Sequence, residues 1–199
     1  TAAGRALIDD ADATAQRSTL GLGTASTLNT GSASENVSLM SDLGWFTHAS
    51  GNVATTSGTS FDFTAIPDWA NEIRLFLDNV SLSGTDQLLI QIGDGAIVST
   101  GYASATVRIN TGNSTSADSS TDGFIVFANF AGFGPTGWIT LQKAFGTTWM
   151  SDHTIYRGTG TITTGGGSKA LSGTLDRLRL LVDGSDTFDS GSALVQYRR

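Results

Sequence analysis

From about residue 37 onward, short apolar runs with a period of two alternate with clusters of Gly, Ser, Asn and Asp. In the clearest run, Ile73, Leu75 and Leu77 share one face of an extended chain, while Phe76 and Asp78 lie on the other. Successive side chains of a strand point to opposite faces, so this alternation predicts half-buried antiparallel strands, about eight to ten in all. Similar runs cover residues 61–63, 88–92, 107–109, 124–130, 138–141, 178–182 and 193–197.

The composition favours an all-β fold and excludes several classes of partner. Only two Glu and two Lys occur among the 199 residues, whereas Gly, Ser and Thr abound, so intrinsic preference leans towards strand. The net charge of −7, without any run of Lys or Arg, argues against nucleic acid and anionic lipid as partners. The absence of cysteine excludes disulfides, Cys-zinc sites and thiol catalysis. No stretch approaches the roughly 18–20 apolar residues of a membrane span, so we expect no membrane insertion.

The first 36 residues differ in texture from the rest. Residues 2–19 are rich in Ala and predict a short helix, whose thin apolar stripe fits contacts with copies of itself. Residues 24–36 are small and polar, which indicates an extended neck. We therefore expect a helical and neck module over 1–36 and an antiparallel, jelly-roll-like β-sandwich head over 37–199. The chain opens without Met or a basic-then-apolar leader, so we expect it to be part of a longer protein.

Two of the apolar runs lack a polar face. Residues 124–130 and 178–182 carry apolar side chains at both odd and even positions. A sheet that is buried on one side by its own core and on the other by a neighbouring subunit would explain this pattern. The two runs therefore predict an oligomer.

Three segments resemble the distal parts of bacteriophage tail fibres. The opening AGRALIDDADATAQRSTLGLGTAST (Ala3–Thr27) resembles a short module that precedes the distal domain of such fibres. The segment Thr59–Ser104, with its Phe-Asp-Phe strand, Ile-Pro-Asp-Trp turn and Gly-Tyr-Ala-Ser step, is similar to that distal domain. So is Asp176–Arg199, which contains Asp-Thr-Phe-Asp-Ser-Gly-Ser. Residues 105–175 match no pattern of the family.

The resemblance implies a homotrimeric receptor-binding head at the tip of a virion's tail fibre. Its expected partners are a polysaccharide or an outer-membrane component of the bacterial surface, and the upstream tail fibre and baseplate proteins. It would act outside the cell as an adhesin, without catalysis and without a cofactor. Two alternatives stay open, a tailspike-type polysaccharide depolymerase and a purely structural trimerisation or capping module. A carbohydrate-binding module of a secreted enzyme is disfavoured by the helical opening.

No catalytic or metal-binding signature emerges from the carboxylates. Hydrolysis of a polysaccharide needs two carboxyl groups held about 5–10 Å apart, but most Asp residues here adjoin Gly or Ser, where their side chains form turns. Asp183, Asp186 and Asp189 could offer oxygen ligands to Ca²⁺. The loop that holds them lacks the EF-hand pattern, however, so turn formation is favoured. The aspartates interpreted as turn formers are Asp78, Asp94, Asp122, Asp183, Asp186 and Asp189.

Two further motifs have structural rather than chemical interpretations. His48 and His153 have no Gly-x-Ser-x-Gly elbow nearby, which leaves nucleophilic catalysis without support. The glycines at 165–167 lack the Lys-Ser/Thr of a phosphate loop, and they predict a flexible loop. Trp69, in the Ile-Pro-Asp-Trp turn, is expected to be a structural plug.

The candidate receptor contacts lie in the part of the chain that matches no pattern. Aromatic rings stack on the C–H faces of sugars, while Asp, Asn and Arg hydrogen-bond to hydroxyls. Loop 110–123 is polar and is the best candidate for an exposed tip loop. For the aromatic set, packing in the core or between subunits is the competing interpretation. The candidate contacts are Trp138, Trp149, Asp152, His153, Tyr156, Arg157 and Asn113.

Overall fold

The chain divides into two compact units, residues 1–45 and residues 46–199. The second unit contains the strands that the structure describes. The computed structural model describes residues 44–112, 114–127, 134–158 and 160–199, together with Asp12, Ala15, Gln16 and Ser18. Two antiparallel sheets form a sandwich, so the predicted all-β sandwich is confirmed. The expected boundary at residue 37 falls outside the described residues and stays a prediction.

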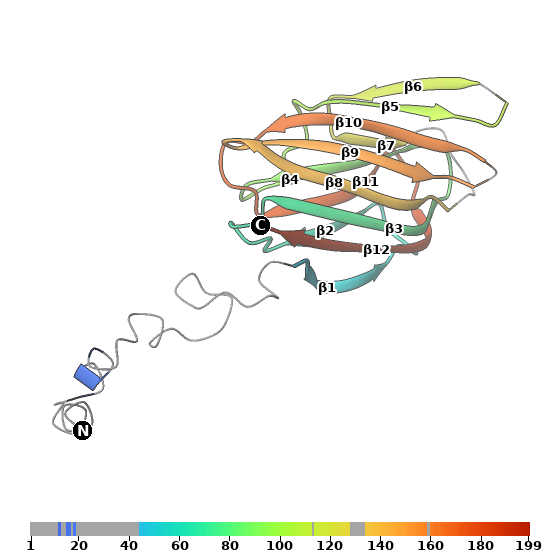
Figure 1. Ribbon diagram of the computed structural model, residues 1–199. Coiled ribbons are helices and arrows are strands. Elements are labelled where there is room, and N and C mark those ends of the chain that lie inside the picture. The colour runs from blue at the N-terminus through green and yellow to red at the C-terminus, as the bar shows by residue number, and fades with distance from the viewer. Residues whose placement is uncertain are drawn as a thin grey trace. The chain divides into compact units, whose positions relative to one another are not determined.

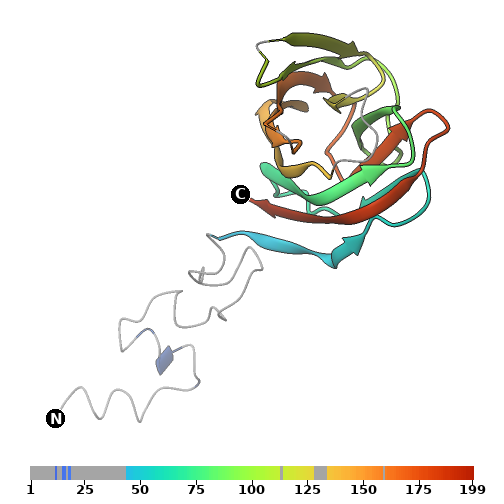
Figure 2. The same cartoon turned by 90° about the vertical axis from the view of Figure 1, so that its right-hand side faces the viewer.

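Within the described residues, eight strands form the larger sheet and four form the smaller one (Figure 1). The larger sheet has the order β1-β12-β3-β8-β9-β10-β5-β6, and the smaller has the order β2-β11-β4-β7. The larger sheet curves around the smaller one, as the turned view shows (Figure 2). The strands are β1 (Phe46–Ala54), β2 (Ser60–Thr64), β3 (Glu72–Leu82), β4 (Gln87–Gly93), β5 (Ala103–Ile109), β6 (Thr115–Ser120), β7 (Phe124–Phe127), β8 (Thr136–Phe145), β9 (Thr148–Tyr156), β10 (Ile162–Ala170), β11 (Arg177–Asp183) and β12 (Phe188–Arg198).

The core lies between the two sheets and is built by the period-two runs. Ile73 and Leu75 of β3 face inward from the larger sheet, and Leu178 and Leu180 of β11 belong to the same buried cluster. Each of these side chains is fully buried, and burying a Leu or Ile side chain contributes about 1.5–3 kcal/mol. The alternation in the sequence thus supplies much of the energy that holds the sandwich together.

The two runs that carry apolar side chains at both odd and even positions are largely covered within a single chain. All four residues of β7 are buried, and Leu89 and Ile125 form a second small cluster on which half-buried Leu181 packs. Residues 124–127 need no neighbouring subunit as a cover, because the chain itself buries all four side chains, whereas such a cover over 178–182 stays a prediction, because Leu181 is only half-buried. Residues 128–130 lie outside the described residues.

Two segments interpreted as loops are strands. Residues 115–120 form β6, which pairs with β5 along its whole length, so the predicted tip loop over 110–123 is wrong in its central part. The glycines at 165–167 lie in the middle of β10, between β9 and β5, so the predicted flexible loop is also wrong. A Cβ on Gly165 would lie 2.5 Å from the carbonyl oxygen of Ala105, so glycine is needed here for close packing rather than for flexibility.

The predicted helix over residues 2–19 is described at four positions only, and the rest of it lies outside the described residues. Ala15, Gln16 and Ser18 are helical, but Asp12 is not. The backbone N–H of Ala15 donates to Asp12 Oδ1 at 2.9 Å, which makes Asp12 a helix cap rather than a helix residue. Within the described residues, no helix has the length and apolar character that a membrane crossing requires.

Trp69 has the structural role expected of it. Its ring contacts those of Phe46 and Tyr197, with centroids 5.2 and 5.5 Å away, and the Arg199 guanidinium lies 5.6 Å from its centre. The Ile66–Trp69 turn is thereby held against β1 and β12.

Candidate functional site

The outer face of the eight-stranded sheet, which points away from the smaller sheet, is unusually apolar. Six large hydrophobic side chains are exposed in the described residues, and five of them lie on this face, the exception being Phe145 next to the β8–β9 turn. They alternate along their strands with the buried side chains of the core. The five are Ile109, Trp138, Met150, Tyr156 and Ile162.

Strand pairing aligns these side chains into a band across the sheet. Leu194 lies opposite Phe76, and Phe76 lies opposite Trp138. In the next row, Tyr156 pairs with Ile162, which pairs with Ile109. Neighbouring strands lie about 4.8 Å apart, so the side chains stand close enough to contact one ligand together. We name this band the apolar stripe; it comprises Leu194, Phe76, Trp138, Tyr156, Ile162 and Ile109.

The centre of the apolar stripe is an aromatic pair. The ring centroids of Phe76 and Trp138 are 6.3 Å apart, with an angle of 46° between the ring planes. Trp138 is 52% exposed, so most of one ring face is open to a ligand. An exposed indole beside a second aromatic ring is a surface on which the C–H face of a sugar can stack.

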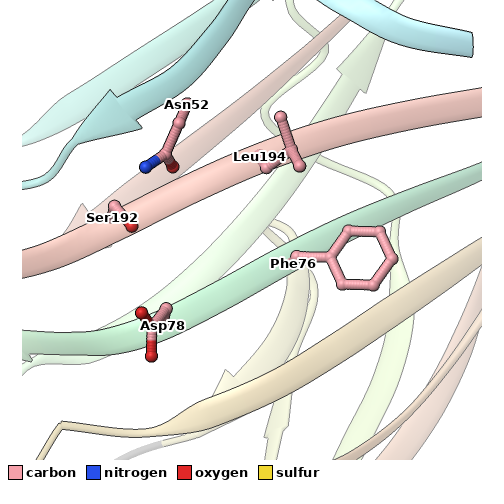
Figure 3. Close-up of a pocket in the computed structure, with 5 residues that line it drawn as sticks. All are labelled: Asn52, Phe76, Asp78, Ser192 and Leu194. Atoms are coloured by element: carbon pink, nitrogen blue, oxygen red, sulfur yellow. The ribbon is translucent and has the colours of Figure 1, made fainter.

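A depression of about 390 Å³ lies at one end of the apolar stripe, over β1, β12 and β3. In the close-up, Asn52, Ser192 and Asp78 lie together on one side, while Leu194 and Phe76 lie on the other (Figure 3). The register accounts for four of the five residues, since Ser192 pairs with Asp78 and Leu194 pairs with Phe76, whereas Asn52 lies opposite Leu194 on β1. The depression therefore offers an apolar floor and a polar edge to the same ligand, a combination typical of binding pockets.

The arginines next to this part of the outer face are tied to a carboxylate. Arg74 Nη2 lies 3.3 Å from Glu72 Oε1, and Arg198 Nε donates to Glu72 Oε2 at 2.7 Å. In the described part of the chain, no ion pair involves Asp78. The charged group that lines the depression is thus a carboxylate, while the two nearby arginines share the single charge of Glu72 and do not line it.

The structure separates the receptor contacts predicted from the sequence. Trp138 and Tyr156 belong to the apolar stripe, and Asp152 is exposed on the same face, one row away from Trp138 and two rows away from Tyr156. Trp149, His153 and Arg157 point into the sandwich, where they are 2%, 5% and 0% exposed. Grouping all five around residues 149–157 is wrong as a surface patch, because alternate residues of β9 point to opposite faces. Asn113 lies outside the described residues.

The sequence reasoning missed several residues of the outer face. Phe76 and Asp78 were placed on the polar side of their strand but not considered as contacts. The alternation in β3 was sufficient to mark Phe76 as exposed. The pairing that brings Asn52, Ser192 and Leu194 beside them has no signal in the sequence pattern.

The buried polar residues His153, in β9, and Arg157, directly after it, are integrated into the core. His153 Nε2 lies 3.2 Å from Thr106 Oγ1 of β5, and burial lowers the pKa of His153 to about 4. The Arg157 guanidinium lies 4.9 Å from the centre of the Phe127 ring, and burial lowers its pKa to about 10. These residues join β9 and β5 to β7, which is a structural role.

We expect His153 to make the stability of the protein depend on pH between about 6.5 and 4. In this window the folded state keeps the imidazole neutral, whereas the unfolded state binds a proton, so stability falls as the pH falls. The full difference between a pKa of 6.5 and one of about 4 corresponds to about 3 kcal/mol. Urea unfolding at pH 7.5, 5.5 and 4.5 measures it, and His153→Gln should remove most of this pH dependence. Equal losses in the variant and the parent would contradict the assignment.

Of the six aspartates interpreted as turn formers, Asp94, Asp122 and Asp186 lie between strands, whereas Asp78, Asp183 and Asp189 are strand residues, for which that interpretation is wrong. Asp94 accepts a hydrogen bond of 2.6 Å from Ser172 Oγ, which lowers the pKa of Asp94. Asp86 and Asp186 each accept the backbone N–H of the other, at 2.8 and 2.7 Å. Asp78 is exposed on β3. Among the described residues, no three His, Asp or Glu side chains gather closely enough to hold a metal ion.

Comparisons with known proteins add little to this geometry. No family model matches the chain, and no curated protein sequence matches it. Among solved structures, a chain in the structure of the Gt strain of infectious bursal disease virus is 12% identical in sequence to this protein, with a TM-score of 0.20, over 74% of this chain. A subviral particle of that virus is 10% identical at a TM-score of 0.20, over 78% of this chain. The chain spans 37% and 36% of those structures' own chains, and likenesses this low carry no argument.

Proposed function

We propose that this protein is the receptor-binding head of a bacteriophage tail fibre, and that it attaches the virion to a bacterial surface glycan without cleaving it. The observation that carries the proposal is the apolar stripe with the depression at its end. Exposed aromatic rings here stand beside hydroxyl, amide and carboxylate groups on a rigid sheet. The resemblance of residues 3–27, 59–104 and 176–199 to tail fibres supports the same function.

A sheet face of this kind fits a polysaccharide better than a small molecule. The apolar stripe crosses six neighbouring strands, from β12 to β5, so it extends over roughly 24 Å at a spacing of about 4.8 Å. A chain of sugar residues can contact several side chains along it, and each contact alone is weak. Three heads per fibre and several fibres per virion would raise the effective affinity by avidity.

The proposal includes a homotrimer, and its test is the mass of the full chain in solution. We expect sedimentation equilibrium to give about three times the 20.6 kDa of the chain at micromolar concentration. A stable, folded single chain at that concentration would contradict the proposed fibre head.

The binding function is tested with the fluorescently labelled full chain on an array of purified bacterial surface polysaccharides. We expect binding to one or a few of them, without the release of new reducing ends on prolonged incubation. Sustained release of reducing ends would establish a depolymerase instead. Failure to bind any polysaccharide, or any cell of a bacterial panel, would favour the purely structural capping module.

A further inference from the structure

We infer that the depression over β1, β12 and β3 accepts a sugar residue that carries no negative charge, either a neutral sugar or one with a free amine. This inference rests on the proposed function and specifies which class of glycan the same face selects. The surface polysaccharides of bacteria include neutral, amine-bearing, uronic-acid and phosphate-bearing polymers. The depression distinguishes them by charge.

The shape and lining of the depression match one face of a sugar ring. Phe76 and Leu194 supply an apolar floor for C–H groups, and Trp138 continues that floor on the neighbouring strand. Asn52 and Ser192 can both donate and accept hydrogen bonds, as hydroxyl and acetamido groups require. These side chains alone would accept a neutral or a charged sugar.

Asp78 provides the discrimination. Its carboxylate is exposed at the edge of the depression, and an ionised carboxylate can only accept hydrogen bonds. Sugar hydroxyls and ammonium groups can donate to it, whereas a uronate or phosphate group would bring like charges together without a donor between them. A like charge placed at a binding site is a common means of rejecting the wrong partner.

The cations nearby do not cancel this effect. Arg74 and Arg198 share the one negative charge of Glu72 at the start of β3, which leaves one positive charge there, but neither arginine lines the depression as Asp78 does. A protein with a net charge of −7 also adds a general repulsion toward polyanions. The local and overall charges therefore favour the same class of glycan.

The test measures the affinity of the 199-residue chain for four polysaccharide groups: neutral hexose polymers, amino-sugar polymers with free amines, uronic-acid polymers and teichoic acids. We expect the parent protein to bind members of the first or second group at least about tenfold more tightly than any member of the other two. Asp78→Asn should narrow this preference, and Asp78→Lys should reverse it toward the acidic polymers. Asp183→Asn removes the same charge at an exposed position at the end of β11, and it should leave the preference unchanged.

The outcomes separate this inference from the function on which it rests. Tight binding of the parent to an acidic polymer would overturn the inference and leave the glycan-binding function intact. The inference would also be overturned if Asp78→Lys kept the parent's preference among the four polysaccharide groups, provided that its circular dichroism spectrum and its oligomeric state equal those of the parent. Binding of the parent to none of the four groups would overturn both.

Discussion

Trp138→Ala is expected to abolish most of the binding of the protein to its glycan, with a loss of affinity of at least about tenfold and up to about a hundredfold. The indole is the largest exposed ring on the outer face, and it stands at the centre of the apolar stripe between Phe76 and the row of Tyr156. Truncation of a central tryptophan commonly costs about 2 kcal/mol or more of binding free energy. Isothermal titration calorimetry, in which a polysaccharide is titrated into the variant, measures the loss of affinity.

Phe145→Ala is the matched control for this change. It also removes an exposed aromatic ring, which is 82% exposed next to the β8–β9 turn, but the ring does not belong to the apolar stripe. We expect its affinity to equal that of the parent. The Trp138→Ala variant must also form the same oligomer as the parent in solution. Dissociation of the oligomer would identify the apolar stripe as a contact between subunits and would contradict a glycan site there.

Trp149→Ala is expected to destabilise the fold by about 3–5 kcal/mol, a large share of the 5–15 kcal/mol that a domain commonly has. Trp149 lies on β9, next to the strand of Trp138, but it pairs with Lys143 farther along the sheet and points inward, where it belongs to the main buried cluster. Its removal leaves a cavity that the surrounding strands cannot close. Urea unfolding monitored by circular dichroism measures the change in the free energy of unfolding.

The stability of Trp138→Ala provides the comparison. Its indole is half exposed, so the free energy of unfolding should change by no more than about 0.5–1 kcal/mol. The two tryptophans would then show opposite phenotypes, one in binding and the other in stability. A stable Trp149→Ala protein would mean that the side chain is not part of the core.

The period of two in the sequence predicted most of the fold, but not the segments in which small residues replace apolar ones. The runs at 73–77, 88–92 and 178–182 become β3, β4 and β11, because alternation and burial are two aspects of the same geometry. The predicted runs also leave out β1 and β9, in which polar residues such as His48, Ser151 and His153 occupy buried positions. β6 and β10 are missed because Ser, Thr and Gly carry no hydrophobic signal. Their strand conformation is imposed by pairing with β5 and β9.

The sequence predicted some residues of the candidate site, such as Trp138 and Tyr156, but not how the site is assembled. Residues 149–157 were grouped by their nearness in the sequence, although alternation alone would have divided Trp149 and His153 from Asp152 and Tyr156. The depression depends on β12 lying between β1 and β3, and strand order comes from contacts between distant segments. No local pattern encodes that order.

The most direct test of a glycan site on the outer face is an NMR titration that follows the indole N–H signals of the four tryptophans. A polysaccharide fragment that binds the protein is added stepwise to the chain labelled with ¹⁵N-tryptophan. We expect the signal of Trp138 to shift in proportion to occupancy, while that of buried Trp149 stays in place. Saturable binding that leaves the Trp138 signal unmoved would show that the ligand sits elsewhere and would contradict the proposed site.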